Sequence, residues 1–290
     1  MNNLLNYNLI GIGEFSHGIM ESWVFRFNLL KYAIKNTDKN IIIFNEMSIW
    51  QADNIMNNTI WSVRDNKYIN YDGIKIDEPL IKNNNYVGGK LWQYINHAME
   101  SELFIKIIKY IRKNKDRITI IGIDNDTIDR DYDMYKIIIK NYKPLNINFL
   151  WASNHHIADL PLNDDNLEYI KNKNHKWFLG HYLKKKLKDD YCIVLSQSYE
   201  GTNRFNGYCI GNNCIKRTWQ LNYFYKKFKY IKNKKYVNKN KKYQLLTNYT
   251  EPLISFSNSY YKGNKYGVQE YINTDTFNYI LFWNEVNELN

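Results

Sequence analysis

Acidic and histidine side chains follow short apolar runs at separate places in this chain. The run that opens Leu9–Gly18 (LIGIGEFSHG) breaks into two glycines and then presents Glu14 and His17. A second run, Asn40–Glu46, also ends on a carboxylate. Ligands of α/β proteins bind beyond the carboxyl ends of parallel strands. We therefore expect two adjacent parallel strands to direct an acid, a histidine and a second acid into one crevice.

The same arrangement recurs twice further along the chain. Ile118–Asp124 reads ITIIGID, and Asn146–Asn154 runs into His155 and His156. Any one of these polar residues has a purely structural explanation, such as a helix cap or a hydrogen-bonded buried side chain. Their shared position after predicted strands favours a common site, formed by Glu14, His17, Glu46, Asp124 and His156.

A histidine with carboxylate partners is suited to activating water as a general base. A carboxylate that holds one ring nitrogen fixes the tautomer and leaves the other nitrogen to accept a proton. An arginine and a second histidine would then stabilise the oxyanion that develops. Arg26, on the helix predicted after Gly18, is the candidate arginine, although its spacing is equally compatible with a solvated side chain.

A serine or cysteine nucleophile and a divalent metal are the alternatives to this chemistry. Ser16 lacks the G-x-S-x-G setting of a serine hydrolase, and the cysteines (Cys192, Cys209 and Cys214) lie outside the set. Two histidines and two or three acids would also make an acceptable divalent-metal site. No close-spaced motif such as H-E-x-x-H decides between the two, so a metal-dependent hydrolase stays open.

Periodicity predicts alternating helices and strands, which is typical of a parallel sheet with right-handed crossovers. We expect an α/β fold: three αβα layers around a mainly parallel sheet, with an α+β C-terminal extension. The chain is predicted to form a single domain over 1–290, with the motifs in 9–205 and an extension of unclear role in 206–290. Helices are predicted over 18–36, 48–56, 91–114 and 177–188, strands over 9–14, 39–46, 118–124, 146–154 and 191–197, and a long loop over 57–89.

The composition adds one alternative and several exclusions. Forty basic against twenty-nine acidic residues give a net charge of +11, and the lysine-rich stretch Lys226–Lys242, interleaved with aromatic residues, could bind single-stranded nucleic acid. A general excess of Lys, Asn, Ile and Tyr explains that stretch equally well. No apolar run approaches the ~20 residues of a membrane span, no signal peptide is recognisable, and the few cysteines suggest a reducing, cytoplasmic setting.

These motifs together resemble those of the erythromycin esterase family. Gly13–Gly18 is similar to its G-E-x-T/S-H-G signature, and Trp151–Ile157 resembles its W-A-H-N-x-H segment. Weaker matches preserve the family's order as far as residue 205: Arg26, Glu46, Gly122–Asp124, Leu179–Leu183 and Glu200–Thr202.

The resemblance implies a hydrolase that needs no metal or other cofactor and acts on a small-molecule ester or lactone. His17 would activate water, Glu14, Glu46 and His156 would orient the base and the substrate, and Arg26 would assist charge stabilisation. We expect the substrate to be bound by a second set of residues: Ser153, Asn154, Asp124, His155 and Glu200.

Two departures from the family pattern bear on this expectation. Ser153 stands where the family has the first histidine of W-A-H-N-x-H, and Asp124 is followed by only a short segment before Trp151. The family carries a large helical insertion there, which walls the substrate cleft, so a macrolide would be loosely held. The loss of a histidine at 153 also keeps open a catalytically inactive relative that acts as a binding protein.

Overall fold

The computed structural model describes most of the chain in segments. The described residues are 1–15, 19–47, 49–56, 59–62, 67–70, 102–124, 129–161, 177–206, 223–229, 231–251, 253–256, 268–271 and 277–286. His17, the predicted base, and Ser48, the first residue of the helix predicted over 48–56, lie outside them.

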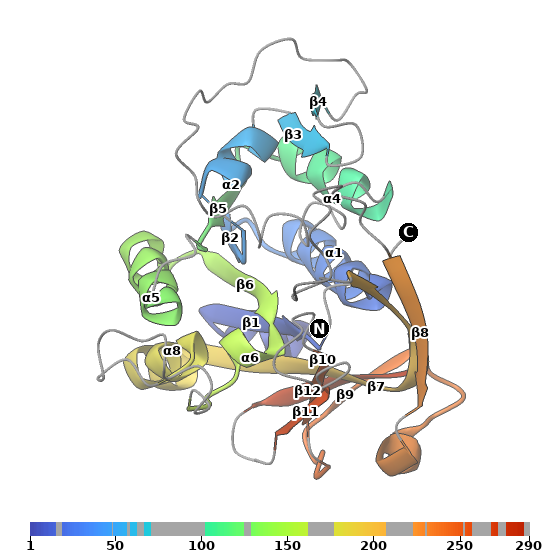
Figure 1. Cartoon of the computed structure of the whole chain (residues 1–290). Helices are drawn as coiled ribbons and strands as arrows, with labels where there is room; N and C mark the ends of the chain where they lie inside the picture. The colour runs from blue at the N-terminus through green and yellow to red at the C-terminus, as the bar shows by residue number, and fades with distance from the viewer. Residues whose placement is uncertain are drawn as a thin grey trace.

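An eight-stranded sheet runs through the molecule in the order β5-β2-β6-β1-β7-β12-β9, with β8 paired to β7 (Figure 1). The first six strands of that order are parallel, while β9 is antiparallel to β12 and β8 to β7. Two separate hairpins, β3–β4 and β10–β11, complete the strands that the structure describes. The bounds are β1 Leu9–Glu14, β2 Ile41–Asn45, β3 Thr59–Ser62, β4 Lys67–Asn70, β5 Ile118–Gly122, β6 Ile147–Ser153, β7 Tyr191–Asn206, β8 Tyr223–Lys229, β9 Tyr243–Leu246, β10 Leu253–Phe256, β11 Val268–Tyr271 and β12 Tyr279–Val286.

Helices cover both faces of the sheet, which confirms the predicted three-layer α/β fold. On β2, Ile41 and Ile43 pack in the cluster that contains the α1 and α4 side chains, whereas Ile42 and Phe44 pack in the cluster that contains α5 and α8. Strand side chains alternate between faces, and a strand buried on both faces reads as a continuous apolar run. The helices are η1 Asn2–Asn6, α1 Met20–Asn36, α2 Ile49–Met56, α4 Glu102–Lys113, α5 Arg130–Asn141, α6 Asn154–Ile157, α8 Leu179–Leu187, η2 Lys188–Asp190 and η3 Ile231–Tyr236.

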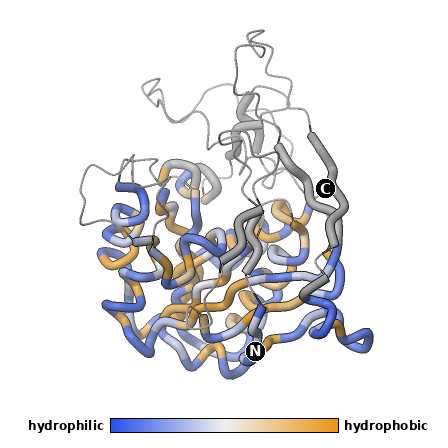
Figure 2. Tube along the Cα trace, turned by 60° about the horizontal axis from the view of Figure 1, so that its bottom comes forward, coloured by the Kyte–Doolittle hydropathy of each residue, from blue (hydrophilic) through white to orange (hydrophobic). Residues whose placement is uncertain are grey.

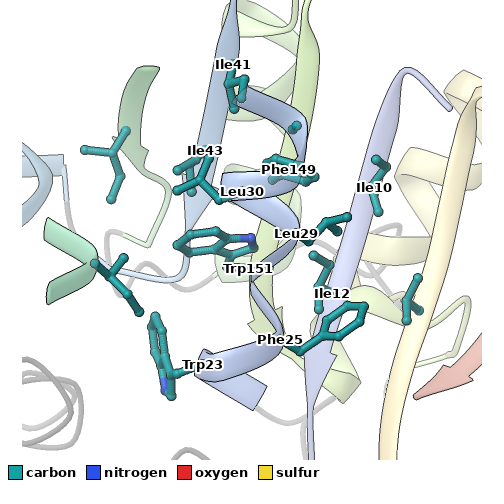
Figure 3. Packing of buried hydrophobic residues seen from close by; sticks show 14 of the residues in the cluster. Ile10, Ile12, Trp23, Phe25, Leu29, Leu30, Ile41, Ile43, Phe149 and Trp151 are labelled. Atoms are coloured by element: carbon teal, nitrogen blue, oxygen red, sulfur yellow. The ribbon is translucent and has the colours of Figure 1, made fainter. Parts of the chain in front are cut away.

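The α1 face of the sheet has an aromatic centre. Trp151 of β6 packs edge-on against Trp23 of α1, with ring centroids 6.2 Å apart, and Trp23 packs in the same way on Phe104 of α4 (5.1 Å). Figure 3 shows Trp151 among the aliphatic side chains of α1 and the neighbouring strands. The hydropathy along the trace agrees, because the apolar segments run through the interior and the hydrophilic ones around it (Figure 2).

The expectation that the first two strands are adjacent was wrong, because β6 lies between β1 and β2. From β1 the chain passes through α1 to β2 and through α4 to β5, and it returns through α5 on the opposite face. If every β-α-β crossover is right-handed, the connecting helix must change face when the chain reverses its direction across the sheet. The return places β6 in the gap that the chain left between its first two strands.

Two other local expectations differ from the structure, and a third is described only in part. α5 was not anticipated at all, although it occupies the short segment between Asp124 and Trp151. The region 57–89 was predicted as loop but contains the β3–β4 hairpin. The described part of the helix predicted over 91–114 is α4, and residues 91–101 lie outside the described segments.

The C-terminal part contributes directly to the central sheet. β12 pairs in parallel with β7 from Tyr279 to Val286, and β9 adds an antiparallel edge. The lysine-rich stretch falls on β8, η3 and the approach to β9. The proposed division near residue 205 and the nucleic-acid interpretation both stay predictions. Of the helices in the described segments, none combines the length and the apolarity that crossing a bilayer requires.

One glycine determines how closely two elements near the strand ends can approach. A Cβ on Gly180, in the first turn of α8, would overlap with the backbone carbonyl oxygens of Ile157 and Ala158. Backbone cannot yield as a flexible side chain does, so only glycine fits where α8 packs on α6.

We therefore expect Gly180→Ala to lower the free energy of unfolding by about 1–3 kcal/mol or more, the usual effect of overpacking. Urea unfolding followed by circular dichroism measures it. Lys185→Ala, on the exposed side of the same helix, is the matched control and should change stability by less than about 0.5 kcal/mol. A Gly180→Ala variant as stable as the wild type would contradict the close contact between α8 and α6.

Candidate active site

Glu14, the last residue of β1, is buried and paired with an arginine. Nη1 of Arg26 donates to its Oε2 at 3.2 Å, and the two side chains are only 4% and 1% exposed. Nη2 of Arg26 donates to the backbone carbonyls of Ile12 on β1 and Ala152 on β6, both at 2.8 Å. Burial lowers the pKa of Arg26, while the nearby carboxylates of Glu14 and Glu46 oppose that effect. Arg26 thus holds the carboxyl ends of two neighbouring strands together.

Glu46 follows β2 and is paired with a different arginine. Nη2 of Arg130, in the first turn of α5, donates to its Oε1 at 3.0 Å. Arg130 also binds Asp124 with two hydrogen bonds, from Nε at 2.9 Å and from Nη2 at 2.6 Å. The other oxygen of Glu46 accepts the backbone N–H of Ser153 at 2.7 Å. One guanidinium therefore joins the acids that follow β2 and β5.

The two glutamates are directed to opposite faces of the sheet. Glu14 continues the alternation of Ile10 and Ile12, which pack in the α1 core, and its arginine comes from α1. Glu46 lies on the same face as Ile42 and Phe44, which pack in the α5 and α8 core, and its arginine comes from α5. Between them lies the end of β6, where Ser153 pairs in register with Glu14.

His156 lies between two carboxylates. Its Nδ1 is 2.7 Å from Oδ1 of Asp131, a hydrogen bond, and its Nε2 is 3.3 Å from Oε1 of Glu46. Burial disfavours the charged ring most strongly, and Arg130 adds to this, but Asp131 and Glu46 together outweigh both and raise the pKa of His156 to about 10. His156 is therefore an imidazolium at neutral pH, a fixed positive charge and not a proton acceptor.

Asn154 joins the end of β6 to β7. Its side-chain amide donates to the carbonyl of Ser196 at 2.8 Å and accepts that residue's N–H at 3.0 Å. Ser196 Oγ in turn accepts the N–H of Phe15 at 2.9 Å. A Cβ on Gly13 would overlap with Oδ1 of Asn154, so the second glycine of the Leu9–Gly18 motif makes room for this bridge.

The structure thus brings together most of the residues predicted from the sequence. Glu46, Asp124 and His156 belong to one network, and Glu14 with Arg26 lies across Ser153 from it. The ring of the half-buried His155 packs against Phe178 with centroids 5.7 Å apart. Glu200 lies along β7 where β8 and β12 pair with it. The catalytic and binding roles assigned to all of these residues stay predictions, as does the position of His17, which lies outside the described residues.

Sequence reasoning missed Arg130 and Asp131, the two α5 residues that complete the network. A signal for them exists: acidic residues precede an apolar i, i+4 pair, Met134 and Ile138, which is typical of the start of an amphipathic helix. Ser196 carried no comparable signal, because its role depends on the packing of β7 beside β1.

The contacts of the acidic and histidine side chains bear on whether they could bind a divalent metal ion. Within the described segments, no group of three or more His, Cys, Asp or Glu side chains is placed to hold a metal ion. Both oxygens of Asp124 bind Arg130, and both ring nitrogens of His156 face carboxylates. A divalent cation bound by these groups would have to displace a guanidinium or an imidazolium.

Fold and site together define an α/β protein with a charged network at the carboxyl ends of its parallel strands. No protein-family model matches the sequence, and no curated protein matches it. Solved structures do resemble it. A succinoglycan biosynthesis protein superposes with a TM-score of 0.65 at 12% identity, covering 99% of this chain and 90% of that one.

Two further structures resemble this chain in the same way. A mutant of the erythromycin esterase EreC in its open conformation gives a TM-score of 0.61 at 12% identity, with 99% and 93% covered. A Bacillus cereus protein gives 0.57 at 10% identity, with 97% and 89% covered. At these identities the likeness shows a shared fold and a distant structural relationship.

The raised pKa of His156 predicts how stability depends on pH. The folded protein binds one more proton than the unfolded chain between the ordinary histidine pKa of 6.5 and about 10. The contribution of His156 to the free energy of unfolding is therefore complete below pH 6.5 and is lost as the pH rises through 10. Over this range the free energy of unfolding falls by up to about 1.4 kcal/mol per pH unit. Urea unfolding from pH 7 to 10 should show a steeper decline for the wild type than for His156→Gln. Equal slopes would contradict the charged state of His156.

Proposed function

We propose that this protein is a hydrolase that uses activated water to cleave an ester or lactone. The observation that carries the proposal is the placement of Glu14 and Glu46, each fixed by its own arginine, on either side of the end of β6. The G-E-F-S-H-G motif continues directly from Glu14, so the chain leading to His17 starts within this edge of the sheet. The fold shared with an erythromycin esterase adds support.

In the proposed reaction, His17 accepts a proton from water as the water oxygen bonds to the carbonyl carbon. The tetrahedral oxyanion then collapses, the bond to the alkoxy oxygen breaks, and the imidazolium returns the proton to that oxygen. The positive charge of His156 lowers the energy of the oxyanion through space, because a preorganised charge in a buried site is weakly screened. Glu14 and Glu46 orient these groups.

The substrate class within esters and lactones is left to experiment. One similar structure is named for succinoglycan biosynthesis and another for erythromycin, and these names point to different compounds. Ser153, half-buried beside Glu14, takes the place of a histidine in the motif that this chain resembles. We expect its hydroxyl to face the substrate and to alter the substrate range relative to enzymes with histidine there.

A panel of p-nitrophenyl esters and simple lactones, assayed with and without EDTA, tests the proposed function. His17→Ala should reduce kcat/KM by about 10²–10⁴-fold, the usual contribution of a general base. Glu46→Gln should also lose activity, because it removes the charge that Arg130 and His156 share. Activity should survive the chelator.

Glu102→Gln serves as the matched control, because its carboxylate is 90% exposed and pairs with the exposed Lys106 of the same helix. It should keep wild-type activity. Full activity of folded His17→Ala would overturn the proposed base. Loss of activity in EDTA with rescue by a divalent metal would favour the metal-dependent alternative. Absence of hydrolysis across the panel would leave a binding protein as the better interpretation.

A further inference from the structure

Asp131 is the one acid of the network that neither a strand end nor a sequence motif supplies. It lies in the first turn of α5, beside Arg130, and its side chain is 11% exposed. Its Oδ1 accepts two hydrogen bonds, from Nδ1 of His156 at 2.7 Å and from the backbone N–H of Leu179 at 2.9 Å. Leu179 is the first residue of α8. A single carboxylate oxygen thus joins α5, α6 and α8.

The imidazole of His156 is held on several sides. Asp131 is bonded to Nδ1, Glu46 faces Nε2, and the ring of Phe178 packs edge-on with centroids 6.0 Å apart. The charged groups that act on the ring are Asp131 and Arg130 from α5 and Glu46 after β2. α8 contributes the backbone N–H that Asp131 accepts. Two carboxylates against one guanidinium favour a charged ring.

Two neighbouring residues of α5 thus act on Oε1 of Glu46, one directly and the other through His156. Arg130 binds Glu46 directly, and Asp131 binds the histidine that faces the same carboxylate oxygen. Side chains of consecutive helical residues point about 100° apart, so one helical turn can reach both. Any rotation of α5 would shift Arg130 relative to Glu46 and Asp131 relative to His156 at once.

We propose that Asp131 is a positioning residue for the candidate active site: it holds the ring of His156 through Nδ1 as a cation whose other nitrogen faces Glu46. The expected effect on activity rests on the proposed function. The expected effect on the protonation of His156 does not. Removal of the Asp131 charge, with its shape retained, should release the proton of His156 at lower pH. The pH–activity profile should then acquire a new alkaline limb.

The test is Asp131→Asn in protein labelled with ¹³C and ¹⁵N at histidine, with the His156 signals assigned through the backbone. In the wild type both ring nitrogens of His156 should be protonated at pH 8. In Asp131→Asn the titration midpoint should fall by about one to three pH units, the usual effect of losing an adjacent opposite charge. With an ester that the wild type hydrolyses, kcat of the variant should match the wild type at pH 6 within about threefold. At pH 9 it should fall by about twofold for a midpoint shift of about one unit and by about 100-fold for a shift of about three.

Asp133→Asn is the matched control, because it makes the same charge change on the same helix, where Asp133 pairs with Lys136 at 2.6 Å. It should leave the His156 midpoint in place. An unchanged midpoint in Asp131→Asn, or wild-type activity of that variant at pH 9, would overturn the proposal. If Asp131→Asn does not fold, the wild-type spectrum decides, since a neutral His156 at pH 8 would also overturn it. If no ester is hydrolysed, the proposed function fails while the titration still tests Asp131.

Discussion

Each of the two strand-end glutamates is neutralised by an arginine from the helix that covers its own face of the sheet. A buried carboxylate alone would be strongly disfavoured, and removing one partner of such a pair costs about 3–5 kcal/mol. Glu14 with Arg26 and Glu46 with Arg130 therefore fix α1 and α5 relative to the sheet edge. Burial, helix placement and the charge of the site are set by the same two contacts.

Ion pairing also changes what the individual groups can do. Arg26 binds two backbone carbonyls besides Glu14, so its geometry is suited to holding strands together more than to meeting a substrate. His156 is charged and faces carboxylates on both ring nitrogens. Proton acceptance must then fall to another group, which is why the proposed chemistry depends on His17. In the proposed reaction the network supplies charge and rigidity, and the motif after Glu14 supplies the base.

The sequence was informative wherever one strand or one helix carried the signal. Continuous β-branched runs located five of the six parallel strands, and the acids at their ends were predicted to converge because such ends share one edge. It could not give the order of strands, since β6 is placed by a crossover and not by any local pattern. Nor could it reveal Asp131, whose partners, His156 and Leu179, lie 25 and 48 residues away along the chain.

The position of β6 between β1 and β2 has a consequence for how the molecule is made. A chain that has emerged only as far as α5 already contains Glu14, Glu46 and both arginines, yet the strand that separates and aligns the two acids is still absent. β6 must enter between strands more than 100 residues earlier in the chain, a long-range closure that is slow to form. Assembly of the charged edge is thus coupled to the insertion of β6, and chains folded only as far as α5 would lack it.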